Sequence, residues 1–190
     1  TKGKCVFDIF ENYLNWPGRM GNFARVMYPL CLPCVDGIVG TCPANIPISR
    51  KPSVIVPNFP RRNLISHHGP RDENNIRIVY FGSLSSVDRD VQALIEVCEH
   101  CLMTSRCFSF AIGGHVSGPG AAEHERSLVT LARKHPDQFR WFGEVSREEV
   151  VRQTCQADIG LILLLSTSPN LIGGSWHKIY EYLHAGVAIF

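Results

Sequence analysis

A lysine and a glutamate three residues apart carry the clearest chemical signal, in HKIYEYLHAG at residues 177–186. Two glycines, Gly173 and Gly174, lie just before this stretch and allow close approach of a ligand to the backbone. If the stretch begins a helix, the free N–H groups and the positive dipole end there favour a phosphate. Lys178 would add a cation, and Glu181 would accept hydrogen bonds from the vicinal hydroxyls of a sugar. An amphipathic helix with ordinary solvated charges is the competing interpretation.

Glycines also follow two earlier apolar runs. Gly82 follows the run at 76–81, and Gly113 and Gly114 follow the run at 108–112, with His115 next. His115 would either touch a phosphate or base in a cleft or be an exposed loop histidine. The glycines do not form a G-x-G-x-x-G fingerprint with an acidic residue beyond it, which argues against a dinucleotide dehydrogenase. The sequence has no G-x-x-x-x-G-K-[ST] motif, so a P-loop kinase is excluded as well.

Alternating strand and helix patterns would position these residues. We expect strands at 76–81, 108–112, 139–142, 158–165 and 187–190, and helices at 91–102, 121–135, from Ser146 onward, and from Ser175 to Gly186. Ser146 and Glu149 form a capping box at the start of the third helix. Nearly continuous apolar strands alternating with helices predict a parallel α/β sheet. Ligands bind at the carboxyl ends of the strands in such sheets, so the strand-end loops should build the site.

The region before residue 75 has a different pattern. We expect strands at 5–10, 35–40 and 54–56, a helix at 20–32, and a polar stretch of linker composition that follows. We therefore assign residues 1–60 to a partial first domain, 61–75 to a linker and 76–190 to the second domain. Both ends of the chain look truncated.

Composition narrows the class of protein. The 190 residues are 45% hydrophobic, with 19 basic and 17 acidic residues and a net charge of +2. The high hydrophobic fraction indicates a buried core, and the balanced charge gives no sign of a nucleic-acid partner. No apolar run approaches the roughly 20 residues that span a bilayer. We expect a cytoplasmic protein whose eight cysteines are reduced.

Other clusters have plainer interpretations. Cys31 and Cys34 form a C-x-x-C pair that follows a helix pattern, whereas a redox pair would begin a helix. Cys98 and Cys101 share an apolar helix face, which favours core cysteines over a zinc site. His67 and His68 stand in the linker without a third ligand, so we predict no metal. Residues 15–33 mix Arg with Trp, Phe, Met and Tyr, which suits either a first-domain helix or a peripheral contact at the inner face of a membrane.

Several motifs, in order, resemble family 4 (group 1) glycosyltransferases of the GT-B fold. The stretch at 176–190 is similar to the signature K-x-x-E-Y-x-x-x-G-x-P-x-[VI] of that family. The segments at 79–84, 111–114, 141–145, 157–160 and 54–60 resemble its other motifs, which are G-x-L, I-x-G-x-G, V-x-F-x-G-x-V, A-D-I-x-L and V-I-P-N. The resemblance spans nearly the whole chain. It implies a Rossmann-like donor-binding domain preceded by the tail of an acceptor-side domain.

The resemblance also implies roles for individual residues. Glu181 would bind the ribose of a nucleoside diphosphate sugar, and Gly143 and Val145 would border its base. Gly82, Ser83, Arg89 and Lys178 would bind its diphosphate, with Gly114, His115, Gly173 and Gly174 as further candidates. The sugar would pass to a glycan or lipid-linked acceptor with retention, without a cofactor. A general base on the acceptor side would come from the first domain.

Two departures from the family pattern bear on function. Gly173 stands eight residues before Glu181, where many members carry the first glutamate of E-x7-E, which contacts the transferred sugar. Ser83 stands where an arginine is common. A non-catalytic nucleotide-sugar-binding subunit and a GT-B-like nucleotide-sugar epimerase therefore remain alternatives to an active transferase.

Overall fold

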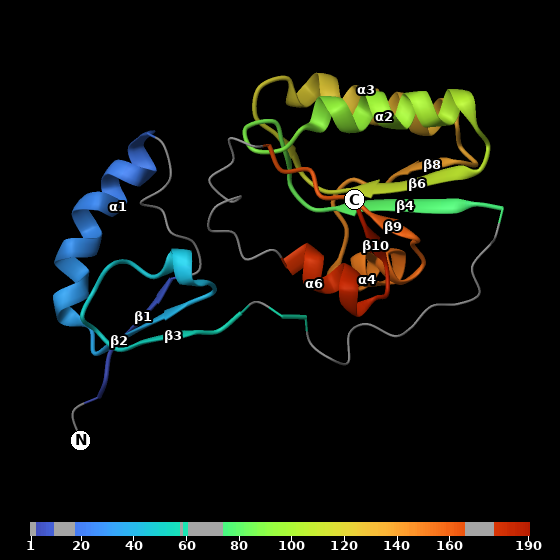
Figure 1. Ribbon diagram of the computed structural model, residues 1–190. Helices are drawn as coiled ribbons and strands as arrows, with labels where there is room; N and C mark the ends of the chain where they lie inside the picture. The colour runs from blue at the N-terminus through green and yellow to red at the C-terminus, as the bar shows by residue number, and fades with distance from the viewer. Residues whose placement is uncertain (1–2, 10–17, 58, 61–73, 166–176) are drawn as a thin grey trace. The chain divides into compact units, whose positions relative to one another are not determined.

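A computed structural model describes residues 3–9, 18–57, 59–60, 74–165 and 177–190. These residues divide into two compact units, the first up to residue 57 and the second from Phe59 onward (Figure 1). Most of the predicted linker, His67 and His68, and the candidates Gly173 and Gly174 lie outside the described residues. The domain boundaries stay a prediction.

The first unit is a small parallel sheet with one helix. Its strands β1 (Val6–Ile9), β2 (Gly37–Gly40) and β3 (Ser53–Ile55) pair in that order. Helix α1 (Gly18–Cys31) and the 3-10 turns η2 (Leu32–Cys34) and η3 (Pro43–Asn45) connect them. The core is formed by four buried residues, namely Ile9, Ala24, Tyr28 and Ile38. The predicted strands and helix of this region are therefore present with bounds shifted by a few residues.

The second unit contains a five-stranded parallel sheet. Its strands are β4 (Ile76–Phe81), β6 (Phe108–Gly113), β8 (Phe139–Trp141), β9 (Ile159–Gly160) and β10 (Ala188–Ile189). The spatial order is β10-β9-β4-β6-β8, so β4 is central and the chain reverses direction across the sheet between β4 and β9. A crevice at the carboxyl ends of the strands beside such a reversal is the usual ligand site of open α/β sheets. A short second sheet, β5 (Leu84–Ser85) and β7 (Val116–Ser117), continues from the ends of β4 and β6.

Helices cover both faces of this sheet. Figure 1 shows α2 (Val91–Thr104) and α3 (Ala121–Lys134) on one face, and α4 (Arg147–Cys155) and α6 (His177–His184) on the other. Alternate residues of β4 supply the two cores, with Ile78 and Tyr80 on the α2 side and Val79 and Phe81 on the α6 side. Burial on both faces explains why the strands read as continuous apolar runs. The predicted Rossmann-like α/β fold is confirmed.

Helix α6 packs closely on the sheet and ends as its sequence predicts. A Cβ at Gly160 of β9 would lie 2.5 Å from the ring of Tyr182, so only glycine permits this approach. The N–H groups of Gly186 and Val187 donate to the carbonyls of Leu183 and Tyr182 at 3.1 and 2.9 Å. Gly186 has φ +66°, and the pattern is a Schellman motif with glycine at C′. The predicted start of this helix at Ser175 lies outside the described residues.

The strand predicted at 158–165 is shorter than expected. Strand pairing to β4 and β10 continues only through Leu161 and Ile162, whose N–H groups donate to Val79 and Phe190 at 3.0 and 2.8 Å. The chain then leaves the sheet, and Leu164 forms an antiparallel bridge with Arg89. The apolar run in the sequence therefore extends beyond the strand, because residues 161–165 still pack against neighbouring segments. Within the described residues, no helix is both long enough and apolar enough to span a membrane.

Candidate functional site

Two glycines let the ends of β4 and β6 come together. Gly82 and Gly114 have φ values of +154° and +141°, which side chains rarely tolerate. A Cβ on Gly114 would overlap the carbonyl oxygen of Gly82, and a Cβ on Gly82 would overlap the ammonium of Lys178. The Gly82 N–H donates to Gly113 at 3.0 Å, and the Gly114 N–H donates to Gly143 at 2.7 Å. These contacts give the carboxyl edge of the sheet a narrow, backbone-lined surface.

A cavity of about 340 Å³ opens at this edge. It lies entirely within the second unit, and contributions come from the ends of β4 and β6, the segment after β8, and helices α4 and α6. Its lining residues are Phe81, Gly82, Gly113, Gly114, His115, Glu144, Val145, Arg147, Val150, His177, Lys178 and Glu181. The cavity therefore combines cationic, anionic and backbone groups with two valines that supply an apolar wall.

Lys178 contributes the cation closest to the central strand. Its ammonium donates a hydrogen bond to the carbonyl of Phe81 and lies 4.8 Å from the centroid of the Tyr80 ring, a cation–π contact. Burial lowers the pKa of Lys178 to about 8; Glu181 opposes this shift, and Arg89 and Arg147 add to it. An anion in the cavity would restore the lost solvation and favour the charged amine.

Glu181 follows Lys178 by three residues and forms an ion pair with Arg147 of α4. The guanidinium Nη2 and the carboxylate Oε1 are 2.5 Å apart, and the two side chains are 44% and 16% exposed. His177 lies one turn before Glu181. Burial is the main cause that lowers the pKa of His177; the Glu181 carboxylate opposes it, and Lys178 and Arg147 reinforce it. The imidazole therefore titrates below its ordinary range.

A second ion pair stands at the outer side of the cavity. Nδ1 of His115 and Oε1 of Glu144 are 2.8 Å apart, with side chains 67% and 73% exposed. Such exposed pairs contribute about 0.2–1 kcal/mol or less. The pair therefore contributes little to the stability of the fold.

The structure brings together most, but not all, of the residues that the sequence singled out. Gly82, Gly114, His115, Val145, Lys178 and Glu181 line the cavity. Ser83 and Arg89 do not. The carbonyl of Ser83 accepts a hydrogen bond from the hydroxyl of Tyr80 at 2.6 Å, and the guanidinium of Arg89 pairs with Asp88. Gly143 does not line the cavity either, and its carbonyl accepts a hydrogen bond from the Gly114 N–H.

Sequence reasoning missed Arg147, Glu144 and His177. Each had a usable signal. Arg147 is the first residue of a helix whose start was predicted from Ser146, and that helix begins at the same sheet edge as the strand-end loops. Glu144 directly follows Gly143, and His177 directly precedes Lys178.

The described residues contain no group of three or more His, Cys, Asp or Glu side chains placed to hold a metal ion. Cys98 and Cys101 both belong to α2. Cys98 is buried in the core, and this burial raises the pKa of its thiol; Cys101 is partly buried and packs against the same core. This placement agrees with the prediction of core cysteines at these two positions.

No protein-family model and no curated protein matches the sequence. Solved structures do match the fold. A trehalose-6-phosphate synthase from E. coli bound with UDP-2-fluoro glucose is 12% identical, with a TM-score of 0.55 over 95% of this chain and 50% of that one. The lipopolysaccharide outer core galactosyltransferase WaaB in its apo form is 14% identical, with a TM-score of 0.53 over 97% and 55%.

These neighbours are GT-B glycosyltransferases. The chain has a GT-B glycosyltransferase fold. It spans about half the length of the enzymes it matches. A further neighbour, the Glycosylation Associate Protein (Gap123) complex from Streptococcus agalactiae, is 10% identical, with a TM-score of 0.55 over 100% of this chain and 38% of that one. The GT-B fold predicted from the sequence is confirmed, whereas membership of family 4 stays a prediction.

Proposed function

We propose that the cavity of the second unit binds the nucleoside diphosphate of a nucleotide-sugar donor. One observation carries the proposal: the Lys178 ammonium and the Glu181 carboxylate line the same cavity, one helical turn apart on α6. The cavity lies at the carboxyl end of the central strand, where α/β sheets bind ligands. A diphosphate needs cations and polar backbone, and a ribose needs an acceptor for its hydroxyls. The cavity offers each of these.

Each group has a distinct task in this proposal. Lys178 binds the diphosphate, which compensates the desolvation of its ammonium. Glu181 accepts hydrogen bonds from the two ribose hydroxyls, a charge-assisted interaction of about 1.5–3 kcal/mol per bond. Val145 and Val150 border the base. Gly82 and Gly114 leave room for the phosphates, because any side chain at either position would fill the space between β4, β6 and Lys178.

The reaction that follows is transfer of the sugar to a glycan or lipid-linked acceptor, with retention. Lys178 contributes to it by neutralising the nucleotide as it leaves, so the transition state is bound more tightly than the ground state. The trehalose-6-phosphate synthase of the same fold is bound with UDP-2-fluoro glucose, which supports a donor of this class. Since this chain spans about half of such an enzyme, transfer is proposed for the whole protein.

Calorimetric titration of the chain with UDP, GDP, ADP and dTDP tests donor binding. We expect at least one of them to bind, and we expect Lys178→Met and Glu181→Ala each to weaken that binding by about tenfold or more. Glu125→Ala, on the exposed side of α3, is the charge-matched control and should bind within about twofold of wild type, because surface substitutions have little effect. If all four ligands fail to bind the wild-type chain, the donor site is refuted.

A non-catalytic nucleotide-sugar-binding subunit is the second candidate. The observation that favours it is the likeness to a component of the Glycosylation Associate Protein complex. Turnover of the bound nucleotide sugar by the full-length protein, followed as release of nucleoside diphosphate, separates the two. Binding together with release that depends on an acceptor supports the transferase, whereas binding without release supports the subunit.

A further inference from the structure

The ion pair between Arg147 and Glu181 connects two helices across the cavity. Arg147 is the first residue of α4, and Glu181 lies in the middle of α6. Their 2.5 Å contact joins Nη2 to Oε1, and both side chains line the cavity. Lys178, one turn before Glu181 on the same helix, donates to the carbonyl of Phe81. Because Lys178 is bonded to the backbone of β4, the described partner of the Glu181 carboxylate is Arg147.

An arginine at the start of a helix has an unfavourable place. The positive end of the helix dipole disfavours a cation there. The next two residues, Glu148 and Glu149, are acidic as the dipole prefers. The Glu181 carboxylate offsets the cost for Arg147. The arrangement directs the guanidinium away from its own helix and toward α6.

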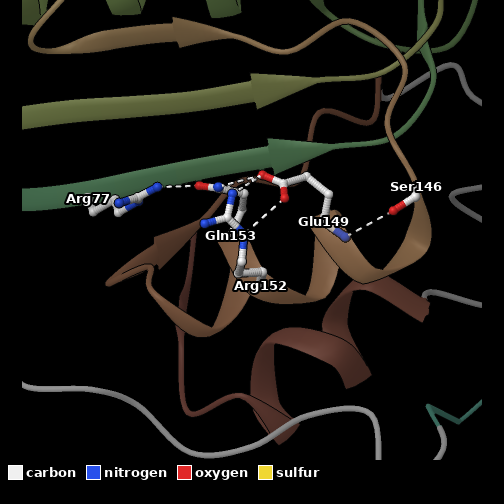
Figure 2. Close-up of polar contacts among 5 residues, drawn as sticks. All are labelled: Arg77, Ser146, Glu149, Arg152 and Gln153. Atoms are coloured by element: carbon white, nitrogen blue, oxygen red, sulfur yellow. Dashed lines mark hydrogen bonds and ion pairs between the residues drawn. The ribbon is translucent and has the colours of Figure 1, made fainter.

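The helix that carries Arg147 is fixed to the sheet by a polar network (Figure 2). The Ser146 hydroxyl accepts from the Glu149 N–H, which caps the helix immediately before Arg147. Gln153, only 1% exposed, donates to Glu149 at 2.7 Å and accepts from the guanidinium of Arg77 on β4. Arg152 forms two hydrogen bonds to Glu149, at 2.9 and 2.7 Å. Because α4 is capped at its start and bonded to β4 in its last turn through Gln153, the backbone of Arg147 has a defined position at the cavity.

We propose that Arg147 is a positioning residue for the proposed ribose site. It holds Oε1 of Glu181 and leaves Oε2 for the two vicinal hydroxyls of the ligand. The inference rests on the proposed function, since it assigns the diol of that ligand to Glu181.

We expect a loss of binding that is selective for the ribose hydroxyls. The two ligands compared are the nucleoside diphosphate that binds the wild-type chain best and its 2′,3′-dideoxy analogue. Arg147→Gln should weaken binding of the ribose form by about tenfold, because a charge-assisted hydrogen bond loses its fixed acceptor. It should leave binding of the dideoxy form within about twofold, because that ligand has no diol for Glu181 to hold. Glu181→Gln should show the same selectivity, and the double variant should lose little more than either single one.

Arg126→Gln is the matched control. Arg126 is an exposed arginine of α3 whose Nε donates to the carbonyl of Ala122 on its own helix. The variant removes the same charge away from the cavity, so binding of both ligands should stay within about twofold of wild type. Arg147→Lys keeps the positive charge, so it should retain part of the wild-type preference for the ribose form over the dideoxy form. If Arg147→Gln does not fold, as judged by thermal unfolding, Arg147→Lys tests the proposal instead. It must weaken binding of the ribose form more than binding of the dideoxy form.

The outcomes are distinct. Equal losses for both ligands would mean that Arg147 binds the phosphates or only supports the fold, and would overturn the proposal. Additive losses in the double variant would overturn it too. If the wild-type chain binds neither ligand, the donor site itself fails, which is a different result from a site that binds but shows no diol selectivity.

Discussion

The inner and outer sides of the cavity use the same kinds of groups under different conditions. We call Gly82, Gly114, Lys178 and Glu181 the inner residues and His115 with Glu144 the rim pair. The Glu181 side chain is 16% exposed in its ion pair with Arg147, whereas both members of the rim pair are more than 60% exposed. Water screens the rim pair and keeps its contribution small, whereas groups on the inner side interact at lower dielectric.

Because the two sides differ in burial, substitutions on them should have different consequences. Inner residues are constrained by backbone conformation, desolvation and close neighbours at once, so a change there affects both folding and binding. Rim residues touch one another and solvent, so a change there should affect neither strongly. The contrast between the inner residues and the rim pair can be tested by substitution.

Gly114→Ala should have the largest effect. The new Cβ would overlap the carbonyl of Gly82, and the backbone at φ +141° disfavours any side chain, so the ends of β4 and β6 must separate. We expect a loss of about 3 kcal/mol or more in the free energy of unfolding, measured by chemical denaturation.

Gly143→Ala is its control on the same sheet edge. Gly143 has φ +61° but open space around its Cβ position, so the cost should be limited to about 1–2 kcal/mol of backbone strain. Equal losses for the two variants would show that the close approach of β4 and β6 is not what requires glycine at 114.

Lys178→Met should remove a pH dependence of stability. The folded-state pKa of Lys178 is about 8, below its ordinary value of 10.5. Between these values the unfolded chain holds a proton that the folded chain has released, so Lys178 makes stability rise with pH in that window. The rise amounts to on the order of 3 kcal/mol and is complete above the unfolded value. Methionine keeps the length of the side chain without the charge.

Denaturation of both proteins across this pH window measures the effect as a difference, because Tyr80 and Cys98 also ionise there in the unfolded chain of both proteins, whereas burial raises their pKa values in the folded chain. Lys134→Met, an exposed lysine at the end of α3, should leave the wild-type pH dependence in place. A Lys178→Met profile parallel to wild type would show that the ammonium is solvated and belongs with the rim.

The sequence predicted the second unit well because its local signals agree with the fold. Apolar strands, the Ser146 cap and Gly186 each specify a local conformation that tertiary packing preserved. The strand predicted at 158–165 was too long, because hydrophobicity reports burial and not pairing, and residues beyond 162 leave the sheet while still packed.

The site was predicted less completely than the fold. Lys178 and Glu181 stand out by spacing within one helix, whereas Arg147 is 34 residues away from Glu181 and meets it only through the packing of α4 against α6. Arg89 has the right residue type in the right order, yet its guanidinium turns to Asp88 at its side. Spacing along one element is readable from sequence, but contacts between elements depend on packing that no single pattern encodes.

The rim pair should give the smallest effect. His115→Ala and Glu144→Ala should each change the free energy of unfolding by less than about 0.5 kcal/mol, because neither side chain is buried. A double-mutant cycle should give a coupling energy of no more than about 0.5 kcal/mol, and less in high salt. A coupling energy near that of a buried pair, about 3 kcal/mol or more, would show that the rim closes over the cavity in solution. The contrast between inner and outer sides would then have to be abandoned, and His115 and Glu144 would join Arg147 and Glu181 as residues that enclose the ligand.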